Sequence, residues 1–238
     1  MLHPRTVDEQ AAFFHENGYV IVENAVPNDY LQRLRRAVER IEAAGLPTRN
    51  LLATDPVFED MIDGHAGFPL LEWLLGDDIQ LLSMDLRTCP PGGGAMGWHA
   101  DHPFFSPSVV SINTALYLDD LTPDNGALRV APRSHKTPFS LGPDEQMAAV
   151  PGEVLVQCQA GTMAIFSDCL WHRTGDNTTD RPRRGVFTYY GHFWHKPCAF
   201  AENPRPFHAM TEFMEGRNPR RAQLLGRSRP GSEYNHYE

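Results

Sequence analysis

The sequence predicts a mainly β protein with flanking helices, in which short antiparallel strands form a two-sheet roll. Helical periodicity is confined to the first third of the chain, and from Ile79 onward short strand-like runs are separated by turn residues. Such a succession is typical of two packed sheets. The 238 residues suffice for one domain of this kind. We expect a single domain with a helical N-terminal part (1–78), a jelly-roll core (79–195) and a C-terminal tail or lid (196–238).

The first third of the chain is expected to form helices that brace the outside of the β core. Leu34, Val38 and Ile41 recur at helical spacing and are expected to be packing residues. Asn28 or Asp29 is the expected N-cap of their helix. The expected elements are helices at 7–17, 30–44, 60–63 and 69–75 and a strand at 19–23.

The core is expected to consist of short strands separated by turns. They are expected at 79–88, 109–118, within 125–135, and at 153–157, 162–166 and 184–193. Alternation places Ser83, Asp85 and Arg87 on one face, which is either solvated or directed into a polar site. A loop at 137–152, rich in proline and glycine, is expected to be mobile. Five arginines within 217–229 indicate a weakly ordered, solvated tail, with a lid over the substrate as the alternative.

Composition and charge narrow the class of partner. The formal net charge of −9 and the isoelectric point of about 5.6 argue against a nucleic-acid-binding surface. Four cysteines without a Cys-x-x-Cys spacing favour reduced thiols. The N-terminus shows no apolar run typical of a signal peptide or a membrane span. We therefore expect a cytoplasmic monomer or homodimer, with neither nucleic acid nor membrane as its partner.

The stretch 97–101 (GWHAD) carries the strongest indication of chemistry. His99 and Asp101 lie two apart on an extended segment, so their side chains point to the same side and can reach one metal ion. Chance alone gives roughly 0.7 such pairs in a chain of this composition, so the pair by itself is weak evidence. His172 supplies a third ligand, completing the two-histidine, one-carboxylate triad of non-haem Fe(II) oxygenases. His102 is expected to point away from the metal.

Four motifs, in this order, resemble the phytanoyl-CoA dioxygenase family of Fe(II)/2-oxoglutarate enzymes. They are FFHENGYVIVENAV, WHAD, NGALRV and WHRTGDNTTDRPRR, and they extend from Phe13 to about Trp194. One position departs from the family pattern: Arg133 stands where a Pro-Gly-Ser-His turn commonly has glycine. The resemblance implies a double-stranded β-helix (jelly-roll, cupin-like) core and a non-haem Fe(II)/2-oxoglutarate-dependent dioxygenase, with the three residues above as its catalytic metal ligands.

The resemblance also implies the overall reaction. In this family 2-oxoglutarate is decarboxylated to succinate and CO2, and O2 oxidises the substrate, most often by hydroxylation. Related halogenases carry a small residue at the position of Asp101. The carboxylate found there therefore favours hydroxylation, or another oxidative rearrangement, over halogenation.

The far carboxylate of 2-oxoglutarate needs a cation with two parallel donors, and the planar fork of arginine provides them best. Arg183 matches the family position, eleven residues after the distal histidine. Arg181 and Arg184 are its rivals, and Arg184 is expected to point the opposite way on the strand. The resemblance further implies contacts to 2-oxoglutarate from Thr174 and Asn113.

The substrate is harder to predict than the co-substrate. Its candidate contacts are Ser83, Asp85, Arg87, Phe104 and Phe105. Two opposite charges on one strand favour a small polar metabolite, and we expect one from natural-product biosynthesis. The alternative from a different class is a non-redox cupin-type metal-binding isomerase or ligand-binding module. A degenerate oxygenase that serves as a structural subunit is a third reading, which the intact triad disfavours.

Overall fold

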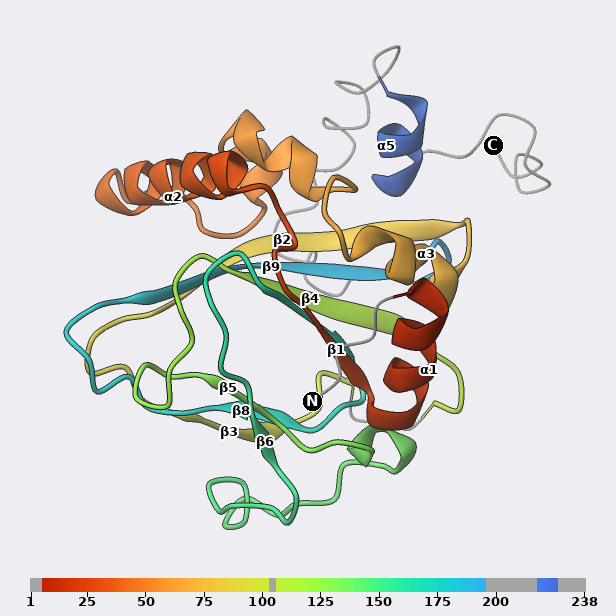
Figure 1. Ribbon diagram of the computed structural model, residues 1–238, viewed down its shortest axis with the longest axis vertical. Helices are drawn as coiled ribbons and strands as arrows, with labels where there is room; N and C mark the ends of the chain where they lie inside the picture. Colours follow the sequence, from red (N-terminus) through yellow and green to blue (C-terminus); the bar gives the residue numbers. More distant parts are fainter. Residues whose placement is uncertain (1–5, 103–105, 196–217, 227–238) are drawn as a thin grey trace.

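In the computed structural model, two antiparallel sheets face each other (Figure 1). The structure describes residues 6–102, 106–195 and 218–226. Within these residues, the larger sheet has five strands, in the order β1 (Tyr19–Val22), β7 (Met163–Ser167), β4 (Ser111–Tyr117), β9 (Arg183–His192) and β2 (Ile79–Cys89). The smaller sheet has four, in the order β3 (Met96–His99), β8 (His172–Thr174), β5 (Leu128–Val130) and β6 (Val154–Leu155). The expected two-sheet roll is therefore confirmed.

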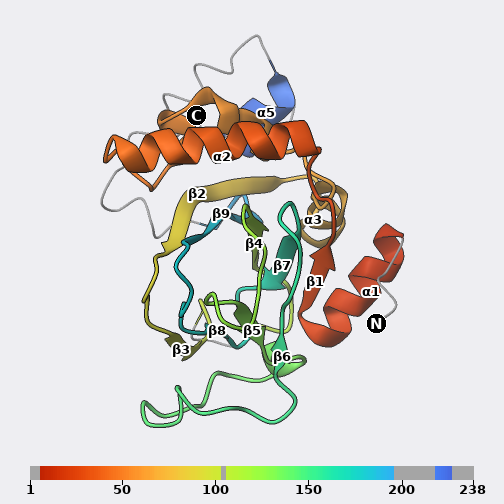
Figure 2. The same cartoon turned by 60° about the vertical axis from the view of Figure 1, so that its left-hand side comes forward.

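Helices cover the outer face of the larger sheet. These are α2 (Asn28–Ala43) and α3 (Phe68–Leu75), while α1 (Val7–Asn17) packs beside β1 at the sheet edge (Figures 1 and 2). The remaining elements are the 3₁₀ helices η1 (Leu51–Ala53), η2 (Pro56–Met61) and η3 (Ser134–Lys136) and the short helix α5 (Pro219–Leu224). In the described ranges, no helix combines the length and apolar character that crossing a bilayer requires.

Local signals explain where α1 begins and ends. The Thr6 hydroxyl accepts a hydrogen bond from the Glu9 backbone, and the Glu9 carboxylate accepts one from the Thr6 backbone, so a capping box begins the helix. Gly18 ends it in a left-handed conformation, with φ of 84°. The expected cap of α2 was wrong, because Pro27 occupies the N-cap position and no side chain caps this helix.

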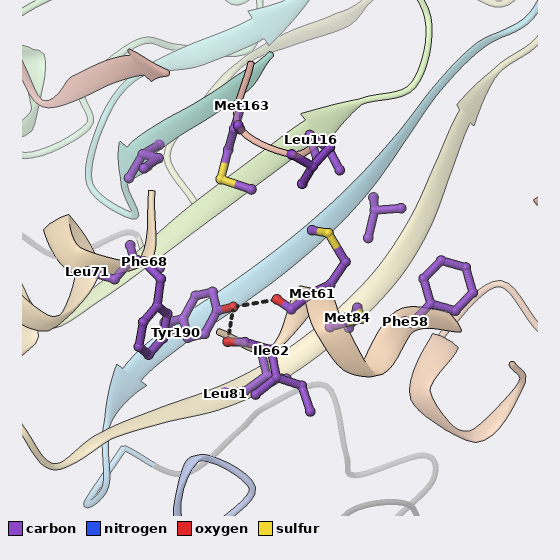
Figure 3. Packing of buried hydrophobic residues seen from close by; sticks show 14 of the residues in the cluster. Phe58, Met61, Ile62, Phe68, Leu71, Leu81, Met84, Leu116, Met163 and Tyr190 are labelled. Atoms are coloured by element: carbon purple, nitrogen blue, oxygen red, sulfur yellow. Dashed lines mark hydrogen bonds between the residues drawn. The ribbon is translucent and has the colours of Figure 1, made fainter. Parts of the chain in front are cut away.

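The main hydrophobic core lies between the helical layer and the outer face of the larger sheet. Figure 3 shows Met61, Ile62 and Phe68 from the helical layer packed near Leu81 and Tyr190 from the sheet. A second, smaller apolar cluster lies between the two sheets, toward β1. Because the apolar contacts are concentrated outside the larger sheet, much of its inner face is free to carry polar side chains.

Two expectations about the helical part need correction. The strand at β1 belongs to the five-stranded sheet, where it pairs with β7, so the N-terminal part contributes to the core itself. The helix expected at 60–63 is the 3₁₀ helix η2, which begins at Pro56. Asp55 starts it early, because its carboxylate accepts a hydrogen bond from the Val57 backbone.

The loop expected to be mobile is docked on β3. The Trp98 backbone donates to the Gln146 carbonyl at 2.8 Å, and the Trp98 indole donates to the Ala148 carbonyl at 2.8 Å. A buried indole N–H needs a partner, and this loop supplies it.

The described part of the C-terminal tail also packs on the protein. Arg220 pairs with Glu72, and Arg221 pairs with Asp60 and Asp63 on the helical side. The expectation that arginines of the tail would be solvated is therefore wrong for these two.

Candidate iron centre and its cavity

A cavity of about 460 Å³ lies between the two sheets. Both sheets and the loops that join them contribute to its wall. Its lining residues are Ser83, Asp85, Arg87, Thr88, Cys89, Pro90, Gly93, Gly94, Met96, His99, Asp101, Asn113, Tyr117, Leu128, Phe166, His172, Thr174, Arg183 and Phe187. The polar inner face of the larger sheet is thus one wall of this cavity.

The three predicted metal ligands converge at the cavity. His99 on β3 and His172 on β8 are register partners, and their ring centroids are 4.2 Å apart. Asp101 follows β3, with its carboxylate oxygens 4.0 Å from Nε2 of His99 and 3.7 Å from Nε2 of His172. One ligand atom from each residue lies within 4.8 Å of the others. This spacing suits a single ion bound by all three side chains.

Backbone carbonyls fix which ring nitrogens are free. Nδ1 of His99 lies 2.9 Å from the Gly97 carbonyl, and Nδ1 of His172 lies 2.9 Å from the Leu170 carbonyl. A carbonyl only accepts, so each Nδ1 donates its N–H and each Nε2 is the ring nitrogen left to bind a metal ion. Burial lowers the pKa of His172, which favours its neutral form. The donor set is therefore prepared for a divalent cation.

A β-bulge brings Met96 and His99 to the same cavity. Met96 pairs with Thr174 and His99 pairs with His172, so three steps on β3 match two on β8. The extra residue breaks strict alternation, as bulges near active sites commonly do. Gly97 lies close to the docked loop, because a Cβ there would lie 3.1 Å from the side chain of Gln146.

The carboxylate of Asp101 has one partner on the larger sheet. Asn113, on β4, donates from Nδ2 to Oδ2 of Asp101 at 2.6 Å. Asn113 also lines the cavity, as expected for a residue near the co-substrate. The resemblance did not imply its contact with Asp101, because that contact depends on how the two sheets are positioned.

Arg183 is a buried cation at the cavity wall, with 5% of its surface exposed. Its Nη2 donates to the Gly126 carbonyl at 3.0 Å, whereas Nε finds no partner among the described residues. Such an orphaned donor fits a site for an anionic ligand. Thr174, which also lines the cavity, accepts from the Met96 backbone at 3.2 Å.

The two rival arginines lie elsewhere. Arg184 points away from the cavity, as expected, and makes a bidentate contact with Asp119 at 3.0 Å for each pair of atoms. Arg181 is exposed and is not part of the cavity lining. Of the three candidates, only Arg183 therefore faces the cavity.

The polar face of β2 is directed into the cavity. Ser83, Asp85 and Arg87 all line it, which favours the inward orientation, although Arg87 is also exposed to solvent. Asp85 accepts from the Asn50 backbone at 3.0 Å and lies 3.7 Å from Arg87. The side chain of Arg87 is 60% exposed, which leaves it accessible to a ligand.

His102 and several aromatic side chains also bear on the site. Phe104 and Phe105 lie outside the described residues. His102 turns away from the triad, as expected, and pairs with Asp168. Phe166 and Phe187, which the sequence analysis did not single out, supply aromatic wall. Strand alternation was the signal available for both, but it does not say which face meets the second sheet.

The fold and the triad together define a class. Two facing antiparallel sheets, with two imidazoles and one carboxylate at the cavity between them, are the features of the non-haem iron oxygenases. The sequence profile of the phytanoyl-CoA dioxygenase (PhyH) family matches residues 50–185, and the chain belongs to this family. It is therefore a non-haem Fe/2-oxoglutarate-dependent dioxygenase, and the alternative of a non-redox isomerase is set aside.

Relatives and solved structures agree with this assignment. Dioxygenase lolE1 of Epichloe uncinata is 29% identical over 219 residues, covering 80% of this chain and 84% of the relative. HygX from Streptomyces hygroscopicus, solved with nickel and 2-oxoglutarate, superposes with a TM-score of 0.70 at 17% identity, covering 81% and 89% of the two chains. EctD from Sphingopyxis alaskensis, solved with 2-oxoglutarate and 5-hydroxyectoine, gives 0.67 at 25% identity, covering 81% and 78%. These likenesses support iron and 2-oxoglutarate as the cofactor and co-substrate.

Proposed function

We propose that the protein binds Fe(II) through His99, Asp101 and His172 and uses 2-oxoglutarate and O2 to hydroxylate a small polar metabolite. The observation that carries the proposal is the convergence of three ligand atoms within 4.8 Å at the wall of one cavity. Two imidazoles and one carboxylate would leave the remaining coordination positions open for other ligands.

The 2-oxoglutarate subsite is proposed on the same wall. Arg183 would hold the far carboxylate, with Thr174 and Asn113 as additional polar contacts. Burial strengthens this interaction, because a charge-assisted hydrogen bond is less screened away from water. The unpaired Nε of Arg183 supports the assignment, since a carboxylate would give that donor its partner.

The chain's own residues would then control where oxidation occurs. Iron and 2-oxoglutarate, when bound, supply the means of activating O2. Phe166, Phe187 and Leu128 line the cavity beside the triad and limit the access of water. The fixed Nδ1 contacts of the two histidines hold their rings in the orientation needed for binding metal.

Polar groups on β2 are proposed to select the substrate. Ser83, Asp85 and Arg87 give the cavity an uncharged hydrogen-bonding group, an anion and an accessible cation. Such a set fits a small polar or zwitterionic molecule better than a long apolar chain. The related EctD was solved with a small molecule of this kind, 5-hydroxyectoine. A substrate from natural-product biosynthesis is our working proposal.

Metal binding tests the ligand assignment. Replacing His99, Asp101 or His172 with alanine should abolish binding of Fe(II), or of Mn(II) as its redox-stable substitute, with the fold retained. Titration under anaerobic conditions measures this directly. The adjacent variant His102→Ala should weaken metal binding far less than the loss of a ligand does, because His102 is not a proposed ligand. Loss of the metal in His102→Ala with retention in His99→Ala would contradict the assignment.

A further inference from the structure

Asp168 is a buried carboxylate to which the proposed function gives no role. It lies in the turn between β7 and β8, with 1% of its surface exposed, and it is not part of the cavity lining. A buried carboxylate is costly unless paired and hydrogen-bonded. Its partners include Ser111, whose hydroxyl donates at 2.5 Å, the imidazole of His102, and Ser167 at 3.3 Å.

These contacts close a ring of four side chains. Asp168 pairs with Nδ1 of His102, whose Nε2 lies 3.1 Å from the Tyr189 hydroxyl. The Tyr189 hydroxyl lies 2.7 Å from the Ser111 hydroxyl. The Ser111 hydroxyl donates to the Asp168 carboxylate, which closes the ring. Such a ring resists deformation, because moving one member disturbs two hydrogen bonds.

The ring is attached to the segments that carry the candidate ligands. His102 directly follows Asp101, and its backbone N–H also donates to the Asp168 carbonyl at 3.1 Å. Ser111 begins β4 two residues before Asn113, whose amide donates to the Asp101 carboxylate. Asp168 is therefore connected to Asp101 by two routes. One route runs through His102, the next residue in the chain, and the other runs through β4, where Ser111 contacts Asp168 and Asn113 contacts the Asp101 carboxylate.

The same turn also leads to the distal histidine. The Leu170 backbone donates to the Ser167 carbonyl at 3.0 Å, and the Leu170 carbonyl accepts from Nδ1 of His172. The turn that places Asp168 therefore places the carbonyl that orients His172. One buried side chain thus connects the supports of two ligands from segments about 70 residues apart in sequence.

We propose that Asp168 is a positioning residue that holds Asp101 in its metal-binding geometry through His102 and Ser111. This inference rests on the proposed function, because it requires Asp101 to be an iron ligand. Loss of an outer partner typically weakens metal binding by about 10- to 100-fold. Because Asp168 acts through intervening groups, we expect the lower end, about tenfold.

The test measures metal affinity apart from turnover. Mn(II) titration of the apoprotein, with free Mn(II) followed by electron paramagnetic resonance, compares the wild type with Asp168→Asn and His102→Gln. Glutamine places its amide near the position of Nε2 and so loses the contact with Asp168, whereas His102→Asn places its amide near Nδ1 and keeps it. We expect about tenfold weaker Mn(II) binding in Asp168→Asn and His102→Gln, with partial recovery in His102→Asn.

A substitution at a buried residue on the other face of β4 controls for a general loss of stability. Thr114→Val removes the hydrogen bond between Thr114 and Thr188, which lies away from the cavity, and should lower the melting temperature without changing Mn(II) affinity. If Asp168→Asn and His102→Gln behave like this control, the inference is overturned. If Asp168→Asn does not fold, the two His102 variants decide the question alone.

Mn(II) binding by Asp101→Ala, measured in the same way, distinguishes failure of the proposed function from failure of the positioning role. If Asp101→Ala binds Mn(II) as the wild type does, the proposed function has failed, and the inference fails with it. If Asp101→Ala loses Mn(II) but the Asp168 and His102 variants bind normally, only the positioning role is overturned.

Discussion

Arg183 and Arg184 show how one step along a strand changes the role of the same side chain. They are adjacent on β9, so their side chains point to opposite faces of the sheet. Arg184 meets Asp119 with two parallel contacts and is held there. Arg183 faces the cavity with a donor that has no partner in the described structure. The environment, and not the residue type, determines which guanidinium is free for a ligand.

Arg183→Ala should raise the 2-oxoglutarate requirement strongly while metal binding is retained. Losing one side of a buried charge-assisted pair costs about 2–5 kcal/mol, which corresponds to roughly 30-fold or more in affinity. The apparent KM for 2-oxoglutarate, with Mn(II) affinity measured in parallel, checks this. Arg184→Ala is the matched control. An unchanged requirement in Arg183→Ala, with the loss in Arg184→Ala, would reassign the anchor.

Arg133 occupies a backbone conformation that favours glycine. Its φ is 71°, in the left-handed region, at the position where the family commonly has glycine. A side chain there costs about 1–2 kcal/mol, because Cβ approaches the following carbonyl oxygen. The compensation is an ion pair with Glu16 at 3.0 Å, but both side chains are more than half exposed, so its contribution is small.

Arg133→Gly should therefore stabilise the protein slightly, by about 0.5–1 kcal/mol after the larger backbone entropy of glycine in the unfolded state is counted. Urea unfolding of the apoprotein measures the change. Arg133→Ala keeps the left-handed strain and loses the ion pair, so it should not stabilise. Equal behaviour of the two variants would mean that the strain is negligible.

Strand β2 combines a structural carboxylate with an accessible cation. Asp85 accepts from the Asn50 backbone and so holds the loop before η1, whereas Arg87 has most of its side chain exposed. Replacing Asp85 would disturb that loop as well as the cavity. Arg87 is therefore the better residue with which to test whether β2 selects the substrate.

Arg87→Ala should weaken the coupled reaction and leave the uncoupled turnover of 2-oxoglutarate in place. The lost charge-assisted contact is typically worth about 1.5–3 kcal/mol, or roughly 10- to 150-fold in kcat/KM. Succinate formation with and without a substrate found by metabolite screening distinguishes the two activities. The melting temperature should not change. Full coupled activity in this variant would remove Arg87 from the substrate site.

Strand periodicity was sufficient to predict the larger features of the molecule. The alternation of Ser83, Asp85 and Arg87 predicted a polar face, and the two-residue spacing of His99 and Asp101 predicted that they share a side. The structure brings both sets to one cavity. Local patterns succeed here because strand geometry determines side-chain direction regardless of what lies opposite.

Features that depend on distant partners were not predictable in this way. The pairing of His102 with Asp168 joins positions 66 apart in sequence, and the helix α5 is held by Asp60 and Asp63 from the other end of the chain. The bulge in β3 also escaped prediction, because it is defined by the register between β3 and β8. Such contacts exist only once the whole fold has formed.

His65 lies where the helical layer meets the outer face of the larger sheet. Its Nε2 lies 3.4 Å from the hydroxyl of Tyr190, and Figure 3 shows that hydroxyl directed at the carbonyls of Met61 and Ile62. Nδ1 of His65 is buried without a partner among the described residues. Burial lowers the pKa of His65 to about 4, because the charged ring would lose its hydration.

This burial should make the folded state sensitive to mild acid. In the unfolded chain His65 titrates near its ordinary pKa of about 6.5, so between pH 6.5 and 4 the unfolded state binds the extra proton. Stability contributed by neutral His65 is therefore present above pH 6.5 and is lost as the pH falls. From pH 7 to pH 5 this loss amounts to about 2 kcal/mol.

Urea unfolding of the metal-free protein at pH 7 and pH 5 measures this loss of stability. His65→Gln, which cannot titrate, should be less stable at pH 7 but should lose about 2 kcal/mol less on acidification. Equal losses in the two proteins would show that His65 is not the group responsible.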